Sequence, residues 1–150
     1  MVLCLPAHDE ADEIVGVMLA QLLELKGQRA MAASQVSLAS EMLELVHEHE
    51  AGAVCISALP PAALAHSRYL CKRLHVKFPE LPTVVGLWTS KVDPKKSLDR
   101  LACPGPVHLV TSVGVAIAEI HQMMQPLLLQ RANAHANIDA MPESPSLVAV

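Results

Sequence analysis

Short runs of apolar residues alternate along this chain with longer segments in which apolar residues recur every three or four positions. The short runs are typical of strands buried on both faces of a parallel sheet, and the longer segments are typical of amphipathic helices. The expected strands are 2–5, 28–33, 53–57, 81–88 and 107–111. Four of the expected helices are 10–26, 62–77, 94–101 and 113–124. A further helix is expected between the first two, capped by Ser37 or Ser40 and ending at 47–50.

The first expected helix has a distinct apolar face. Its large apolar residues follow one another at three- and four-residue spacing, and Gly27 ends the segment. Acidic residues gather at its amino end, where they favour the helix dipole but would repel a phosphate group. The members of the apolar face are Ile14, Val17, Met18, Leu22 and Leu25.

Five strands alternating with five helices predict an α/β domain with a single open parallel sheet and helices on both faces. The expected strand order is the flavodoxin-like 2-1-3-4-5, whose switch point lies between the first and third strands. Ligands of such sheets bind outside the carboxyl ends of the strands. This order would bring the loops at His8 and Ser57 side by side, with Gly86 next to them.

The composition changes after residue 130. Residues 131–150 are rich in Asn, Ala, Pro and Ser and have no hydrophobic periodicity. We therefore expect a domain over residues 1–130 and a disordered tail over 131–150.

Composition and charge narrow the function classes. Apolar residues make up 52% of the chain and charged residues 17%, and the formal net charge is −4. That charge predicts no general attraction to nucleic acid or to an anionic membrane, and aromatic residues, the stacking platforms of single-strand binders, are only 2% of the chain. No apolar stretch reaches ~18 residues, so we expect no membrane insertion.

The four cysteines, Cys4, Cys55, Cys71 and Cys103, show no C-x-x-C spacing, and two of them lie in expected strands. This distribution predicts buried free thiols in a reducing compartment rather than metal or redox centres. We expect a cytoplasmic protein.

Three segments resemble the motifs of cobalamin-binding domains with this architecture, which carry D-x-H-x-x-G after the first strand, S-x-L after the third and a Gly-Gly pair near the fourth. The resemblance implies that His8 ligates the cobalt of cobalamin, that Ser57 and Leu59 contact the nucleotide tail, and that Gly86 lets the tail pass. The corresponding segments are Pro6-Ala7-His8-Asp9-Glu10-Ala11, Ser57-Ala58-Leu59 and Gly86-Leu87. Pro6, Ala11 and Leu87 replace the Asp and two of the glycines of the motif.

Two further resemblances give alternatives. The amino-acid sequence of residues 3–24 and 55–74 is similar to the soluble domain of autoinducer-exporter-like permeases. This resemblance implies an accessory domain of a membrane permease. The strand order and the acids after the first strand resemble response-regulator receivers. A receiver needs an aspartate at the end of the third strand and a lysine at the end of the fifth, where this chain has Ser57 or Ala58 and Thr111 or Ser112.

The chain lacks G-x-S-x-G, glycine-rich phosphate loops and a nucleophile with a base at informative spacing, although Ser57 and His8 could meet across the switch point. We therefore expect a non-enzymatic regulatory, ligand-sensing or interaction domain of degenerate cobalamin-binding type. A functional cobalamin module and a pseudo-receiver are the alternatives. Its expected partner is a small molecule, with cobalamin as one candidate cofactor, or a protein, including a second copy in a homodimer.

Overall fold

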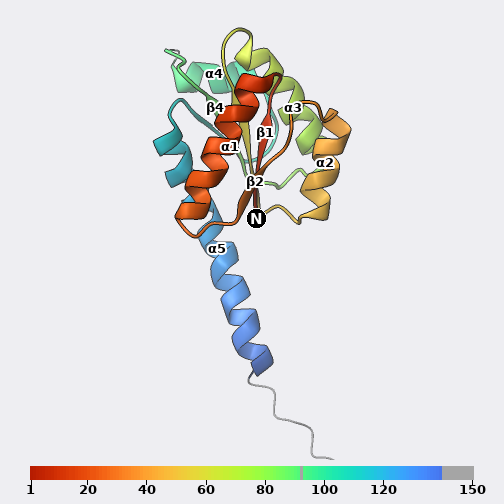
Figure 1. The fold of residues 1–150 in the computed structure, drawn as a ribbon, viewed down its shortest axis with the longest axis vertical. Coiled ribbons are helices and arrows are strands. Elements are labelled where there is room, and N and C mark those ends of the chain that lie inside the picture. Colours follow the sequence, from red (N-terminus) through yellow and green to blue (C-terminus); the bar gives the residue numbers. More distant parts are fainter. Residues whose placement is uncertain (92, 140–150) are drawn as a thin grey trace, which may run out of the picture.

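Five parallel strands form one sheet in the order β2-β1-β3-β4-β5 in the computed structural model, which describes residues 1–91 and 93–139 (Figure 1). The predicted fold class and strand order are confirmed. The strands are β1 (Val2–Pro6), β2 (Ala30–Ala32), β3 (Ala53–Ala58), β4 (Thr83–Leu87) and β5 (Val107–Val110). The helices are α1 (Glu10–Leu25), α2 (Ala39–Glu48), α3 (Ala63–Lys77), α4 (Pro94–Leu101) and α5 (Val113–Asp139).

Helices cover both faces of the sheet, and each face has its own core. Side chains alternate along β1, so Leu3 and Leu5 join the core beneath α2, α3 and α4, whereas Val2 and Cys4 join the core beneath α1 and α5. β1, β3 and β4 are buried on both faces, and their sequences are apolar apart from Ser57 and Thr83.

The apolar face that the sequence indicates for α1 is the exposed side of the helix. The helix packs on the sheet through Gly16, Leu19, Ala20 and Leu23, whereas Met18 is 55% exposed and Leu25 84% exposed. The buried residues have the same three- and four-residue spacing as the exposed ones, so periodicity alone could not distinguish the two faces. The large apolar residues that face outward are Ile14, Val17, Met18, Leu22 and Leu25.

Helix α5 begins at Val113 as predicted but does not end at Met124. It continues through Pro126 to Asp139, and its carboxyl half extends away from the sheet (Figure 1). Proline lacks the amide proton that would bond the preceding turn, and the helix nevertheless continues past it. Residues 131–139, which we expected in the disordered tail, are helical, and residues 140–150 lie outside the described residues.

Helix α2 begins one residue before the second of its two expected caps. Leu38 holds the N-cap position, so neither Ser37 nor Ser40 caps the helix. The carboxylate of Glu41 instead accepts a hydrogen bond from the Leu38 amide at 2.7 Å. Glu41 thus satisfies the amide of the N-cap residue, whereas a serine cap would accept from the amides of the first turn.

The prediction of four free thiols was right for two cysteines and wrong for the other two. Cys4 and Cys55 are free and buried at paired positions of β1 and β3. Burial raises the pKa of Cys4 to about 12, and burial beside Cys4 raises the pKa of Cys55 well above its ordinary value. Cys71 and Cys103 form a disulfide, because the fold brings their Cα atoms within 6.2 Å although they are 32 residues apart in sequence.

Within the described part of the chain, no helix is both long enough and apolar enough to cross a membrane.

Candidate functional site

The carboxyl ends of β1, β3 and β4 meet at one edge of the sheet, where the sequence predicted the site. Ser57 pairs with Pro6 on one side and with Gly86 on the other, so the predicted neighbours Ser57 and Gly86 lie side by side. His8 and Leu59 follow in the loops that leave β1 and β3. All four predicted site residues therefore lie at or just beyond this edge.

A tryptophan that the motif comparison did not include fills the space beside Ser57 and Gly86. The indole N–H of Trp88 donates a hydrogen bond to the Ser57 hydroxyl at 2.8 Å, and both side chains are buried. A Cβ atom added at Gly86 would overlap the indole ring. The glycine here makes room for Trp88, and a nucleotide tail could lie at this position only if the indole swung out.

Asp12 holds the two loops at this edge together. One carboxylate oxygen accepts from the Leu59 amide at 2.7 Å, and the other accepts from the His8 amide at 2.9 Å. Asp9 caps α1 by accepting from the Asp12 amide, and its own amide lies 3.4 Å from the Asp12 carboxylate. Because Asp12 is buried and its oxygens are used by backbone amides, it is a structural latch between the β1–α1 and β3–α3 loops.

The ring of His8 is exposed and lies against another imidazole. The His8 and His66 ring centroids are 4.1 Å apart, with the ring planes tilted by 32°. Among the residues described by the structure, the groups with three or more metal-ligating side chains do not include His8. The role of His8 as a metal ligand therefore stays a prediction from the resemblance.

The strand ends carry few groups suited to phosphoryl transfer. β3 ends at Ala58, and Thr111 and Ser112 follow β5. The aspartate and lysine that a receiver places there are replaced by residues that can neither accept a phosphoryl group as a carboxylate nor neutralise it as an ammonium group.

Sequence reasoning overlooked three residues that shape the molecule: Asp12, Trp88 and His75. Asp12 stands three residues after Asp9, and this spacing of two acids at a helix start indicates a capping box. His75 stands four residues after Cys71, which places both side chains on one face of a helix. Cysteine-to-cysteine spacing alone does not reveal this pair. The position of Trp88 over Gly86 has no local sequence signal, because it depends on how the chain turns after β4.

Comparisons with known proteins show the fold. No family model and no curated protein matches this chain. NtrX from Brucella abortus has 16% identity and a TM-score of 0.54, over 99% of this chain and 31% of that one. A LuxR-family DNA-binding response regulator from Staphylococcus aureus has 13% identity and a TM-score of 0.51, over 82% and 98%. The orphan response regulator HP1043 of H. pylori has 14% identity and a TM-score of 0.50, over 83% and 97%.

The chain therefore has the flavodoxin-like fold found in response-regulator receivers, and it spans about a third of the length of the NtrX chains that it matches. These structures give no support to the two other resemblances, to cobalamin-binding domains and to permease domains.

We predict that Asp12→Asn lowers the free energy of unfolding by about 1–3 kcal/mol, because an amide cannot accept from amides on both sides. Urea denaturation measures the change. Glu10→Gln, which removes one charge from the same helical turn at an exposed position, is the matched control and should change the free energy by no more than about 0.5 kcal/mol. Equal losses in the two variants would contradict the latch.

We also predict that the chain retains no hydroxocobalamin. Trp88 occupies the space that a nucleotide tail needs. Because Trp88 is the only tryptophan of the chain, its fluorescence also reports on that space. After incubation in the dark and desalting, the visible spectrum should lack corrin absorbance and the Trp88 emission should be unquenched. Retained corrin absorbance that His8→Ala abolishes would contradict this prediction and restore the cobalamin interpretation.

Proposed function

We propose that this chain is a receiver-like regulatory domain that associates with a second copy of itself and carries out no phosphoryl transfer or other catalysis. The receiver-type fold supports the regulatory class, and the residues at the ends of β3 and β5 support the lack of phosphoryl transfer. The observation that carries the proposal is the apolar outer face of α1. Ligand binding at the sheet edge plays no part in it, because Trp88 and Asp12 already occupy that edge.

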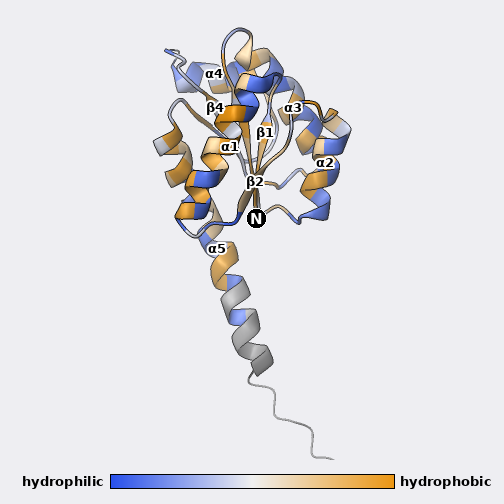
Figure 2. Ribbon diagram, viewed as in Figure 1, coloured by the Kyte–Doolittle hydropathy of each residue, from blue (hydrophilic) through white to orange (hydrophobic). Residues whose placement is uncertain are grey.

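The outer face of α1 is a continuous apolar stripe. Ile14, Met18, Leu22 and Leu25 follow at spacings of four, four and three residues, which places them along one side of the helix. All four are exposed, and Figure 2 shows hydrophobic residues along this helix. Exposed apolar patches of this kind mark interaction sites, and fully burying a large apolar side chain is favourable by about 1.5–3 kcal/mol.

The charges at the two ends of α1 favour a second copy as the partner. Asp9 and Glu10 are exposed at its amino end. Lys26 and Arg29 are exposed just beyond its carboxyl end and outweigh the one exposed acid of the last turn, Glu24. Two α1 helices packed antiparallel about a two-fold axis would place the acids of one copy beside the basic residues of the other. The stripe between them carries no charge, so the same surface complements itself.

A shallow groove beside this stripe enlarges the face. It lies between the carboxyl end of α1 and the first turns of α5, and it is lined by Lys26, Gly114, Ile117, Ala118 and His121. The small residues of α5 leave room there for side chains from a partner helix. If the chain is part of a transporter, as its resemblance to permease domains suggests, such pairing would join the transporter's accessory domains.

We predict that the chain is a dimer and that Met18→Glu dissociates it. A carboxylate in the middle of an apolar interface would lose its hydration without gaining a partner, so the dissociation constant should rise at least tenfold. Light scattering over a range of protein concentrations measures this.

Val76→Glu is the matched control. Val76 is an equally apolar residue, 85% exposed on α3, which covers the opposite face of the sheet. This variant should remain a dimer. A wild-type chain that stays monomeric at the highest concentration, or two variants that dissociate alike, would contradict the proposal.

A further inference from the structure

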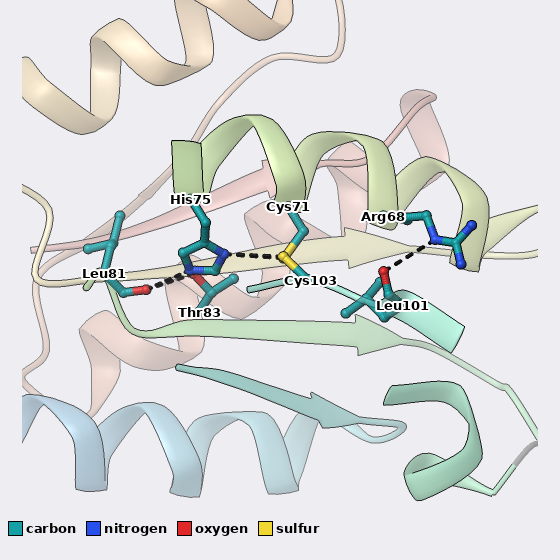
Figure 3. Close-up of a disulfide and its surroundings, with 7 residues drawn as sticks. All are labelled: Arg68, Cys71, His75, Leu81, Thr83, Leu101 and Cys103. Carbon is teal, nitrogen blue, oxygen red and sulfur yellow. Dashed lines mark hydrogen bonds between the residues drawn. A yellow bond between two sulfur atoms is a disulfide. The ribbon is translucent and has the colours of Figure 1, made fainter. Parts of the chain in front are cut away.

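The disulfide between Cys71 and Cys103 has a histidine directed at it. Cys71 and His75 lie one turn apart on the buried side of α3, and Cys103 comes from the loop between α4 and β5 (Figure 3). Nδ1 of His75 is 3.2 Å from Sγ of Cys103 and 3.7 Å from Sγ of Cys71. The three atoms lie within 4.8 Å of one another. Residues from two separate segments thus bring two sulfurs and one nitrogen together.

The other side of the imidazole fixes its tautomer. Nε2 of His75 lies 3.1 Å from the Leu81 carbonyl oxygen, which can only accept, so Nε2 carries the proton and donates it. Thr83 Oγ1 lies 3.2 Å from the same nitrogen and itself donates to Leu81. Nδ1 is therefore left with its lone pair facing the sulfurs. Metal-ligating histidines are oriented by this kind of bond from the opposite ring nitrogen.

The surrounding backbone holds the ring in this position. His75 is only 4% exposed, and a Cβ added at Gly105 would come within 2.9 Å of the imidazole Cδ2 atom. Gly105 also has a φ of 98°, in the region that glycine prefers. A disulfide requires none of these arrangements, because two bonded sulfurs need no lone pair beside them. The imidazole thus offers its lone pair to the two sulfurs as a possible third ligand atom.

We propose that Cys71, Cys103 and Nδ1 of His75 bind one zinc ion when the disulfide is reduced. In the reduction, two molecules of a small thiol would be oxidised to the disulfide of that thiol. Cys71 and Cys103 would each gain one proton and one electron. Zinc would then displace both thiol protons and bind two thiolates and the neutral imidazole. The disulfide and the zinc complex are alternative links between α3 and the α4–β5 loop.

The charge and the spacing of the ligands both fit zinc. Two thiolates neutralise the two positive charges of the ion, so the complex adds no net charge to a site in which Cys71 is fully buried and His75 almost so. Tetrahedral coordination with ordinary zinc bond lengths separates ligand atoms by roughly 3.5–3.8 Å. The two Nδ1–Sγ distances are already close to this range, so reduction has to separate mainly the two sulfurs.

The position of Cys103 provides access. It lies in a loop and is half-buried, whereas Cys71 is fixed in the middle of a helix. An ion can therefore enter from the loop side, and water from that side can supply the fourth ligand, as in zinc sites with three protein ligands.

The test uses the full chain reduced with a phosphine, which leaves no competing thiolate in solution. Reduced protein is mixed with zinc, or with cobalt as a spectroscopic probe, and desalted without oxygen. We expect one zinc per reduced chain by elemental mass spectrometry, none per oxidised chain, and thiolate-to-cobalt charge-transfer absorption in the cobalt sample.

Single-residue variants distinguish the loss of a zinc ligand from the loss of the fold. Cys103→Ser, in the loop, and His75→Ala should each lose the bound zinc, whereas His49→Ala, at an exposed histidine elsewhere, should retain it. Thr83→Val keeps the side-chain shape and should weaken zinc binding about tenfold by removing one support of the imidazole. Circular dichroism verifies the fold of each variant. A reduced wild-type chain that retains no zinc, or zinc retention unchanged in both folded Cys103→Ser and folded His75→Ala, would overturn the proposal.

Discussion

Helix α1 packs closely on the sheet, and this packing sets the position of the loops at the candidate site. Gly16 lies over Cys4 and Ser57, so that a Cβ atom there would already be in van der Waals contact with both. Gly16 and Ala20 on the buried side let the helix pack close to the sheet. Asp12 holds the first turn of the helix to the loops after β1 and β3. Leu19 and Leu23 are buried beside Gly16 and Ala20, whereas the other large apolar residues of α1 point outward.

The sequence predicted the architecture because its strongest signals are those of a parallel sheet. The buried strands are continuous apolar runs, and their alternation with helices leaves few possible topologies. The buried side of α1 could not be predicted in the same way. Both sides of this helix are apolar with the same spacing, and the buried side is the one whose Gly16 faces Cys4 and Ser57.

The sequence predicted where the candidate site lies but not which side chains surround it. The switch point brings Ser57 and Gly86 together, as the strand order requires. The indole that covers them comes from the residue after β4, and no pattern within that segment indicates its direction. The pairing of Cys71 with Cys103 likewise joins α3 to a loop that follows β4 and α4 in the sequence. This pairing is therefore visible only in the folded structure. By contrast, the four-residue spacing of Cys71 and His75 was readable in the sequence.

The two faces of the domain thus carry different chemistry on one receiver-type fold. The α1 face has an uncharged apolar stripe between oppositely charged ends, and the α3 face has two sulfurs and an oriented imidazole. Site-directed cross-linking tests self-association through α1. In an antiparallel pair centred on the stripe, Met18 lies near the two-fold axis. Met18→Cys should therefore form an intermolecular disulfide under mild oxidation, whereas Val76→Cys should not. Equal cross-linking of the two variants, or none in either, would contradict the account.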